Sequence, residues 1–284
     1  MPQDLTLILD SPNQAGLPLH FRRMDSPFTP GPGPRPTRLG LDSIKASGGH
    51  QFSVAELDTM LANLPTKPVI IDLRQESHGF LNGTAVSWYS PMDFANNGKT
   101  LSVIEADEHT RLKAQLSLGR ACLTIVQAKD SGGHITQADT QEIPVTEIQT
   151  EAQVVAGRHL RYLRLAVTDH TRPADKDIDD FLRFYREMPK DTWLHLHCHA
   201  GEGRTTVFLI MMDMLANASQ VSAEDIATRQ HLLGGLDILN AHAVGFKLQP
   251  ALERAEFVRR FHQYALQNPQ AKPLLWSEWL AKQR

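Results

Sequence analysis

The feature that most constrains this chain is a cysteine loop placed between an expected strand and an expected helix. We expect the strand over residues 192–197 and an apolar, buried helix over residues 204–217. The loop that joins them reads His197-Cys198-His199-Ala200-Gly201-Glu202-Gly203-Arg204-Thr205. An anion bound in such a loop meets a row of backbone N–H groups and the positive end of a helix dipole. The sequence therefore predicts a site for a phosphate-sized anion.

The residue types in this loop suit the transfer of a phosphoryl group. Arg204 can hold two phosphate oxygens at once, which a lysine cannot do. The positive surroundings favour the thiolate form of Cys198, the form that attacks phosphorus. The hydroxyl of Thr205 can donate to the sulfur and help it leave in a second step. Gly201 and Gly203 allow the backbone to turn its amides inward.

The alternative to a reactive loop is a buried cysteine that happens to precede an ordinary helix. Six specified residues at fixed spacing would arise by chance at a given position with a probability on the order of 10⁻⁸, from typical residue usage. We therefore interpret the loop as a phosphate site lined by His199, Ala200, Gly201, Glu202 and Gly203. An acidic side chain that faces a phosphate would oppose its binding. We therefore expect the side chain of Glu202 to point away from the phosphate site.

A thiolate nucleophile needs a separate acid that protonates the departing oxygen. Asp169 follows an expected strand over residues 162–167 and precedes an expected helix over residues 174–188. On spacing alone, this aspartate is either the general acid or a cap of the turn. If it is the acid, it is protonated while the cysteine is ionised, and we expect an acidic pH optimum.

Composition and charge exclude several classes of protein. The net charge of -3 argues against a nucleic-acid binder, although a cleft can still attract an anionic substrate. The most apolar stretch, residues 207–216, is too short to span a bilayer and contains Asp213. The N-terminus lacks a basic region and a long apolar run, so no signal peptide is visible. Two cysteines make no disulfide framework, and we expect Cys122 to pack in a buried strand.

The order of the elements predicts an α/β fold with an insertion. Residues 1–50, with a cluster of prolines and glycines, are expected to form an irregular arm. The phosphatase core is expected over residues 51–90 and 151–284, with a small β-rich module over residues 91–150. Within the core, we expect a helix over 53–64 capped by Ser53, a strand over 68–73, a polar loop over 74–97 and a helix over 248–267. Residues 105–116 are expected to be helical, and 121–150 to form short strands.

The loop matches the pattern His-Cys-x5-Arg-Ser/Thr, and in this it resembles the protein tyrosine phosphatase superfamily. Further segments, from about Phe21 to the C-terminus, resemble the bacterial cysteine phytases, which are protein-tyrosine-phosphatase-like inositol polyphosphatases. These segments are Asp72-Leu73-Arg74-Gln75-Glu76-Ser77-His78-Gly79, Val86-Ser87-Trp88-Tyr89, Thr168-Asp169-His170 with Pro173, Arg229-Gln230-His231 with Gly234-Gly235, and Trp276-Ser277 with Trp279-Leu280.

The resemblance implies a central sheet flanked by helices, with an inserted partial β-barrel. It also implies a small polyanionic substrate, phytate (inositol hexakisphosphate), cleaved stepwise without a metal or another cofactor. The general acid of the family falls on Asp169. The substrate contacts implied by local matching are Arg22, Asp93, His170, Lys247 and Arg254. By analogy with the family, the protein is expected to be secreted or periplasmic.

Two positions depart from the pattern of the family. His199 stands where glutamate is frequent, and Glu202 stands where a small apolar residue is frequent. The basic residue expected within the inserted module does not align cleanly, and both Lys129 and His134 are candidates.

Two other functions remain open from the sequence. The first is a phosphatase for phosphotyrosine or phosphoinositides, which the many basic side chains disfavour because one phosphate on a peptide needs few of them. The second is a non-catalytic module that binds inositol phosphates. The presence of Cys198, Arg204 and Asp169 together favours an enzyme over such a module.

Overall fold

Two β-sheets organise this computed structural model, which describes residues 5–30, 33–240 and 242–283. The five-stranded sheet has the order β10 (Arg161–Arg164), β4 (Pro68–Asp72), β11 (Trp193–His197), β3 (Ala46–Gly49) and β2 (Arg22–Arg23). Strands β10, β4, β11 and β3 run parallel, and β2 is antiparallel at the edge. Because parallel strands end at the same edge, the segments that follow β4, β10 and β11 meet there.

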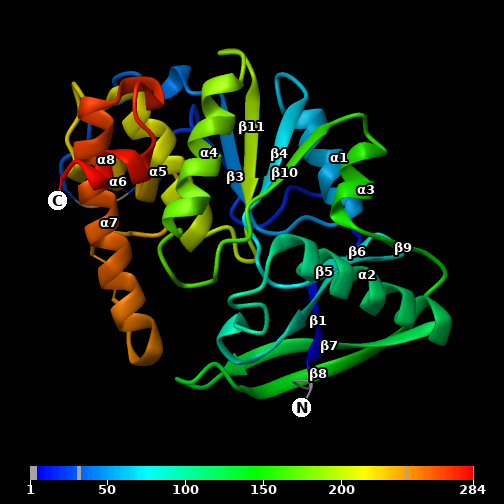
Figure 1. Ribbon diagram of the computed structural model, residues 1–284. Coiled ribbons are helices and arrows are strands. Elements are labelled where there is room, and N and C mark those ends of the chain that lie inside the picture. The colour runs from blue at the N-terminus through cyan, green and yellow to red at the C-terminus, as the bar shows by residue number, and fades with distance from the viewer. Residues whose placement is uncertain (1–4, 31–32, 241, 284) are drawn as a thin grey trace.

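Helices cover both faces of this sheet, as an α/β fold requires (Figure 1). One face carries α4 (Asp175–Glu187), α5 (Gly203–Asn217), α6 (Ala223–Leu232), α7 (Leu248–Gln267) and α8 (Trp276–Ala281). The other face carries α1 (Val54–Asn63) and α3 (Glu151–Ala156). Short 3-10 turns lie at Leu41–Ser43, Pro91–Asp93, Gly245–Lys247 and Pro269–Ala271. The predicted class, a mixed α/β fold with a sheet flanked by helices, is confirmed.

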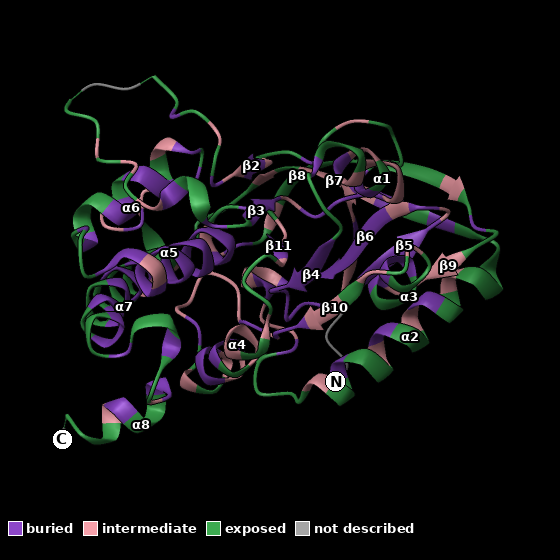
Figure 2. Ribbon diagram, turned by 90° about the horizontal axis from the view of Figure 1, so that it is seen from above, coloured by how far each residue is buried: buried purple, intermediate pink, exposed green. Residues whose placement is uncertain are grey.

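Helix α5 is the centre of the larger hydrophobic core. Nearly all its residues are buried, as its apolar sequence predicts (Figure 2). It packs on β3, β11, α6 and α7. Because α5 begins directly after the cysteine loop, this packing also fixes the position of the loop.

The second sheet lies beside the first and holds six strands. Its order is β8 (Ile135–Pro144), β7 (Arg120–Lys129), β1 (Thr6–Ser11), β6 (Thr84–Tyr89), β5 (His78–Leu81) and β9 (Ile148–Gln149). Helix α2 (Leu101–Leu118) buries Ile104 and Leu112 against it. None of the described helices is both long and apolar enough to cross a membrane.

The structure corrects two expectations about the N-terminal third. The described part of residues 1–50 is not an irregular arm throughout, because it supplies β1, β2 and β3, and the expected loop 74–97 contains β5 and β6. The six-stranded sheet therefore combines β1, β5 and β6, which precede residue 91, with β7, β8 and β9, which lie within residues 91–150. Strand β1 forms only through distant pairing, such as that of Ile8 with Thr124, which no local sequence pattern reveals. Strands β5 and β6 form a local hairpin, and its two-residue turn Asn82-Gly83 is a signal that the prediction of a loop missed.

Cys122 is exposed, which corrects the prediction that it packs in the interior. The strand itself is present as β7, but its side chains alternate between two faces. Ala121 and Leu123 take the inner face and are 3% and 1% exposed. Cys122 between them faces outward.

Candidate active site

The cysteine loop lies where β11 ends and α5 begins, on the wall of a cleft of about 930 Å³. Cys198 is 2% exposed and lines this cleft. The hydroxyl of Thr205 donates to its sulfur over 3.2 Å. The first turn of α5 begins at Gly203, so amides without helical partners lie next to the cysteine. This is the strand, loop and helix arrangement that the sequence predicts.

The two loop glycines are required for different reasons. Gly201 has a φ of 70°, and a Cβ there would lie 2.2 Å from the carbonyl carbon of Gly49. Any other residue at this position would therefore be strained and would also clash. A Cβ on Gly203 would lie 2.7 Å from Nη1 of Arg254, so this glycine leaves room for a cation beside the loop.

A buried carboxylate holds the loop arginine in place. Arg204 is 1% exposed, and its two terminal nitrogens contact Glu76 Oε2 and Oε1 at 2.7 and 2.9 Å. Glu76 also accepts from Arg74 Nε at 2.8 Å. Burial would lower the pKa of Arg204, but the negative charges of Asp169 and Glu76 outweigh burial. They raise the pKa of Arg204 well above its ordinary value. The guanidinium is therefore charged and fixed in orientation.

Sequence reasoning gave Glu76 no role of its own. The available signal was the pair of charged residues Arg74 and Glu76, which follows the buried strand β4 after Leu73. A charge at the carboxyl end of a central parallel strand is buried beside the ligand site and has to find a partner there.

Asp169 lies against the same arginine. Its Oδ1 is 3.1 Å from Arg204 Nε, and its Oδ2 is 3.3 Å from His170 Nε2. Burial raises the pKa of Asp169, but Arg204 and, to a smaller extent, His170 together outweigh burial, so the pKa lies below its ordinary value. A phosphate held by Arg204 would compete for that charge and restore the proton affinity of the carboxylate. The position suits a general acid that gains its proton with the substrate.

His170 also faces the cleft. Its backbone has a φ of 63°, a left-handed conformation that costs free energy and turns the segment after Asp169. Its ring contacts Phe246 edge-on at 5.2 Å between centroids. Burial lowers the pKa of His170 to about 4, so the ring is neutral at most working pH values.

Three cations predicted as contacts for further phosphates line the cleft. They are Lys129, Lys247 and Arg254. The ammonium of Lys129 lies 3.6 Å from the centroid of the Tyr89 ring. His134, the other candidate of the inserted module, is not among the residues that line the cleft, and it pairs with Asp130 at 3.3 Å.

Asp93 and His199 stand together on another part of the wall. Asp93 Oδ2 is 3.9 Å from His199 Nδ1, and His199 Nε2 is 3.3 Å from Asp10 Oδ1. Burial raises the pKa of Asp93. Burial would lower the pKa of His199, but Asp10 and Asp93 outweigh it and raise it. An imidazolium at His199 would compensate the carboxylate of Asp93 in a cleft that has to bind an anion.

Arg22 does not line the cleft, which differs from its expected contact with substrate. It is 3% exposed, and its guanidinium donates to the carbonyl of Gly201 at 2.8 Å and to Thr206 Oγ1 at 3.0 Å. Through these two bonds, Arg22 stabilises the cysteine loop and the start of α5. Glu202 is among the residues that line the cleft, and its carboxylate lies 3.4 Å from Nδ1 of His20, with about half of its side chain exposed.

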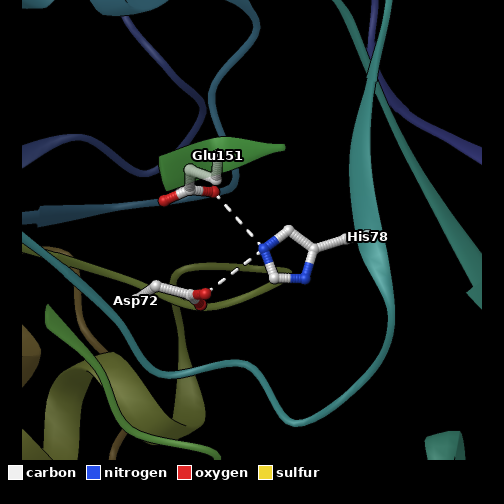
Figure 3. A group of neighbouring side chains, drawn as sticks. All are labelled: Asp72, His78 and Glu151. Carbon is white, nitrogen blue, oxygen red and sulfur yellow. Dashed lines mark ion pairs between the residues drawn. The ribbon is translucent and has the colours of Figure 1, made fainter. Parts of the chain in front are cut away.

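Among the residues that the structure describes, two groups of side chains bring possible metal ligands within 4.8 Å of one another. They are Asp72, His78 and Glu151 (Figure 3), and Glu76, Asp93 and His199. In each group a protein cation already neutralises a carboxylate. Arg164 lies 3.1 Å from Asp72, and Arg204 holds Glu76. Their negative charge is thus compensated within the protein.

The family models identify the same region of the chain. Residues 71–216, which include Glu76, Asp169 and the cysteine loop, match the model of the PTP-like phytases, described as "Inositol hexakisphosphate". Among curated proteins, the effector protein hopD2 of Pseudomonas syringae pv. tomato is 34% identical over 249 residues. That match covers 86% of this chain and 53% of hopD2.

Solved structures give a similar result. The PTP-like myo-inositol phosphatase from Mitsuokella multacida, in complex with myo-inositol-(1,3,4,5)-tetrakisphosphate, is 36% identical with a TM-score of 0.90. The match covers 100% of this chain and 48% of that one. A PTP-like phytase from Bdellovibrio bacteriovorus is 31% identical with a TM-score of 0.75, over 98% of this chain and 95% of that one. This chain thus spans about half the length of hopD2 and of the Mitsuokella protein.

Proposed function

Because this chain belongs to the PTP-like phytase family, we propose that it hydrolyses myo-inositol polyphosphates stepwise through a cysteinyl-phosphate intermediate. The observation that carries this proposal is the arrangement around one sulfur. Cys198 accepts from Thr205, and the loop that holds it ends in Arg204, which is fixed by Glu76 and contacts Asp169. The nucleophile and the acid thus line one cleft, and the arginine that would hold the anion contacts the acid.

The reaction follows from these positions. The thiolate of Cys198 attacks phosphorus, Asp169 gives its proton to the departing oxygen, and Arg204 with the loop amides stabilises the charge of the transition state. In the second step, Asp169 takes a proton from water, which attacks the phosphocysteine and releases phosphate. The sulfur leaves as a thiolate, stabilised by the hydroxyl of Thr205.

The substrate class follows from the walls of the cleft. The cleft is far larger than one phosphoryl group, and Lys129, Lys247 and Arg254 line it away from the sulfur. Several cations around a broad cleft suit a small molecule with several phosphates better than a peptide with one. The Mitsuokella complex, which holds an inositol tetrakisphosphate, supports the same substrate class. The relative that is an effector protein favours an exported protein.

The test compares phytate with a phosphotyrosine peptide under the same conditions, with phosphate release as the readout. We expect kcat/KM on phytate to exceed that on the peptide by at least about tenfold, because only phytate engages the outer cations. The Cys198→Ser enzyme supplies the background for both substrates. A peptide that is cleaved at least about tenfold better than phytate would replace this proposal with that of a phosphotyrosine phosphatase.

A further inference from the structure

A buried ionic cluster behind the cysteine loop has no part in the reaction described above. Figure 3 shows it: the Nε2 of His78 lies between two carboxylates, 3.3 Å from Asp72 and 3.4 Å from Glu151. At most 1% of each of these three side chains is exposed. Burial would lower the pKa of His78, but the negative charges of Asp72 and Glu108 together outweigh burial. They raise the pKa of His78 to about 10. The ring is therefore a cation held between two anions.

Such a cluster is a poor way to stabilise a fold. Removing charges from water is costly, and apolar side chains of similar volume often hold a buried site as well or better. A positional role explains the cluster better if it reaches the catalytic loop.

Glu151 reaches the loop through the residue before the nucleophile. Its Oε1 lies 2.6 Å from Nε2 of His197, and both side chains are buried. The ring of His197 contacts Phe52 at 5.0 Å in one core cluster, whereas Cys198 belongs to the core cluster on the other side of the sheet. Because the two side chains point to opposite faces, Glu151 acts on Cys198 through the shared backbone.

Gln51 extends this grip to the other side of the nucleophile. Its side chain donates to Oε2 of Glu151 at 2.9 Å, and its backbone N–H donates to the carbonyl of His199 at 3.0 Å. Its side-chain oxygen accepts from Arg74 at 2.8 Å, and this arginine is the one that supports Glu76. One buried chain of contacts thus connects His197 and His199, the two neighbours of the cysteine, to Glu76, which holds the loop arginine.

We propose that Glu151 is a positioning residue of the phosphatase, which fixes the backbone on both sides of Cys198 by holding His197 and Gln51. The contacts of Glu151 with His197 and, to a smaller extent, with His78 hold its pKa well below the ordinary value, so its carboxylate is ionised in the interior. The inference rests on one part of the proposed function, which is that the cysteine loop performs the reaction. It applies to any phosphate monoester that is cleaved at this loop. A displacement of about 1 Å at reacting groups can lower a rate by about 10²-fold.

The first test is Glu151→Gln, which keeps the size of the side chain and removes its charge, with para-nitrophenyl phosphate as substrate. We expect kcat to fall about 10- to 100-fold, while KM changes by less than about threefold, because geometry affects the reacting step more than binding. An unchanged kcat in the folded variant would overturn the proposal. Since this substrate carries no inositol, the result is independent of whether phytate is cleaved.

Glu108→Gln is the matched control. Glu108 is 2% exposed and lies in the same network, where it contacts Arg164 at 2.9 Å and the backbone N–H of His78 at 3.2 Å. Its polar contacts within the described part of the chain go to His78 and Arg164, which lie outside the cysteine loop. We expect its loss to lower the thermal midpoint about as much as that of Glu151, and to leave kcat within about twofold. An equal loss of kcat in both variants would show a general structural effect and contradict the proposal.

A double-mutant cycle tests the route through His197. His197→Asn shortens the side chain that contacts Glu151. If Glu151 acts through His197, this variant should also lower kcat about 10- to 100-fold. It therefore tests the proposal by itself if Glu151→Gln does not fold. We expect the double variant to be no slower than the slower single one, since both changes remove one interaction. Effects on kcat that multiply would show that Glu151 does not act through His197.

Discussion

Replacing Cys198 with serine is expected to lower kcat on phytate by on the order of 10⁴- to 10⁶-fold, as loss of a nucleophile does in other covalent enzymes. The serine hydroxyl has nearly the size of the thiol but stays protonated, so the amides and Arg204 have no anion to stabilise before attack. The fold should be retained because the change is nearly isosteric. The measurement is phosphate release with enzyme in excess over any contaminating activity.

Cys122→Ser is the control for this experiment. It replaces the only other cysteine of the chain, which is exposed on β7. Phosphate release should stay unchanged. If Cys198→Ser retains more than about a hundredth of the activity, the thiolate is not the nucleophile and the reaction scheme is wrong.

Arg204→Lys is expected to lower kcat by on the order of 10³-fold, the usual effect of losing an arginine that stabilises a phosphoryl transition state. A lysine keeps the charge but cannot contact Glu76 and two phosphate oxygens at once. It would also leave Glu76 with fewer partners, since Arg74 would be the arginine that still holds this buried carboxylate beside the anionic substrate. Initial rates on phytate and para-nitrophenyl phosphate measure the loss, which should be similar on both.

Arg229→Lys provides the matched control, because it changes another buried arginine that grips a carboxylate with two nitrogens. Arg229 contacts Asp213 in this way, on α6 and α5, and is not among the residues that line the cleft. We expect it to lower the thermal midpoint while kcat stays within about twofold. If both variants lose activity in proportion to stability, Arg204 has no special part in catalysis.

The parts predicted from sequence are those determined by local patterns. The capping box of Ser53 and Glu56 starts α1 where expected, and the strand, loop and helix around Cys198 follow directly from the order of residue types. In each case the interacting groups lie within a few positions of one another. The two short strands β2 and β3 had no such signal, because Arg22 and Ser47 gain strand geometry only by pairing across the sheet.

The support of the site could not be predicted for the same reason. Glu76 and Arg204 are 128 positions apart, and Glu151 and His197 are 46 positions apart. Sequence also cannot tell on which side of a loop a cation lies, so Arg22 was expected in the cleft although it braces the loop from behind. The choice between Lys129 and His134 depended on how the β7–β8 hairpin turns, and only the former lines the cleft.

The most direct measurement is a rapid-quench reaction of Asp169→Asn with para-nitrophenyl phosphate, followed by mass spectrometry of the peptide that contains Cys198. Nitrophenol leaves without help from an acid, whereas the second step still needs Asp169 as a base, so the intermediate should accumulate. We expect a burst of nitrophenol close to one per enzyme and one phosphoryl group on Cys198. No burst, or a phosphoryl group on any other residue, would contradict the claim that this sulfur attacks phosphorus.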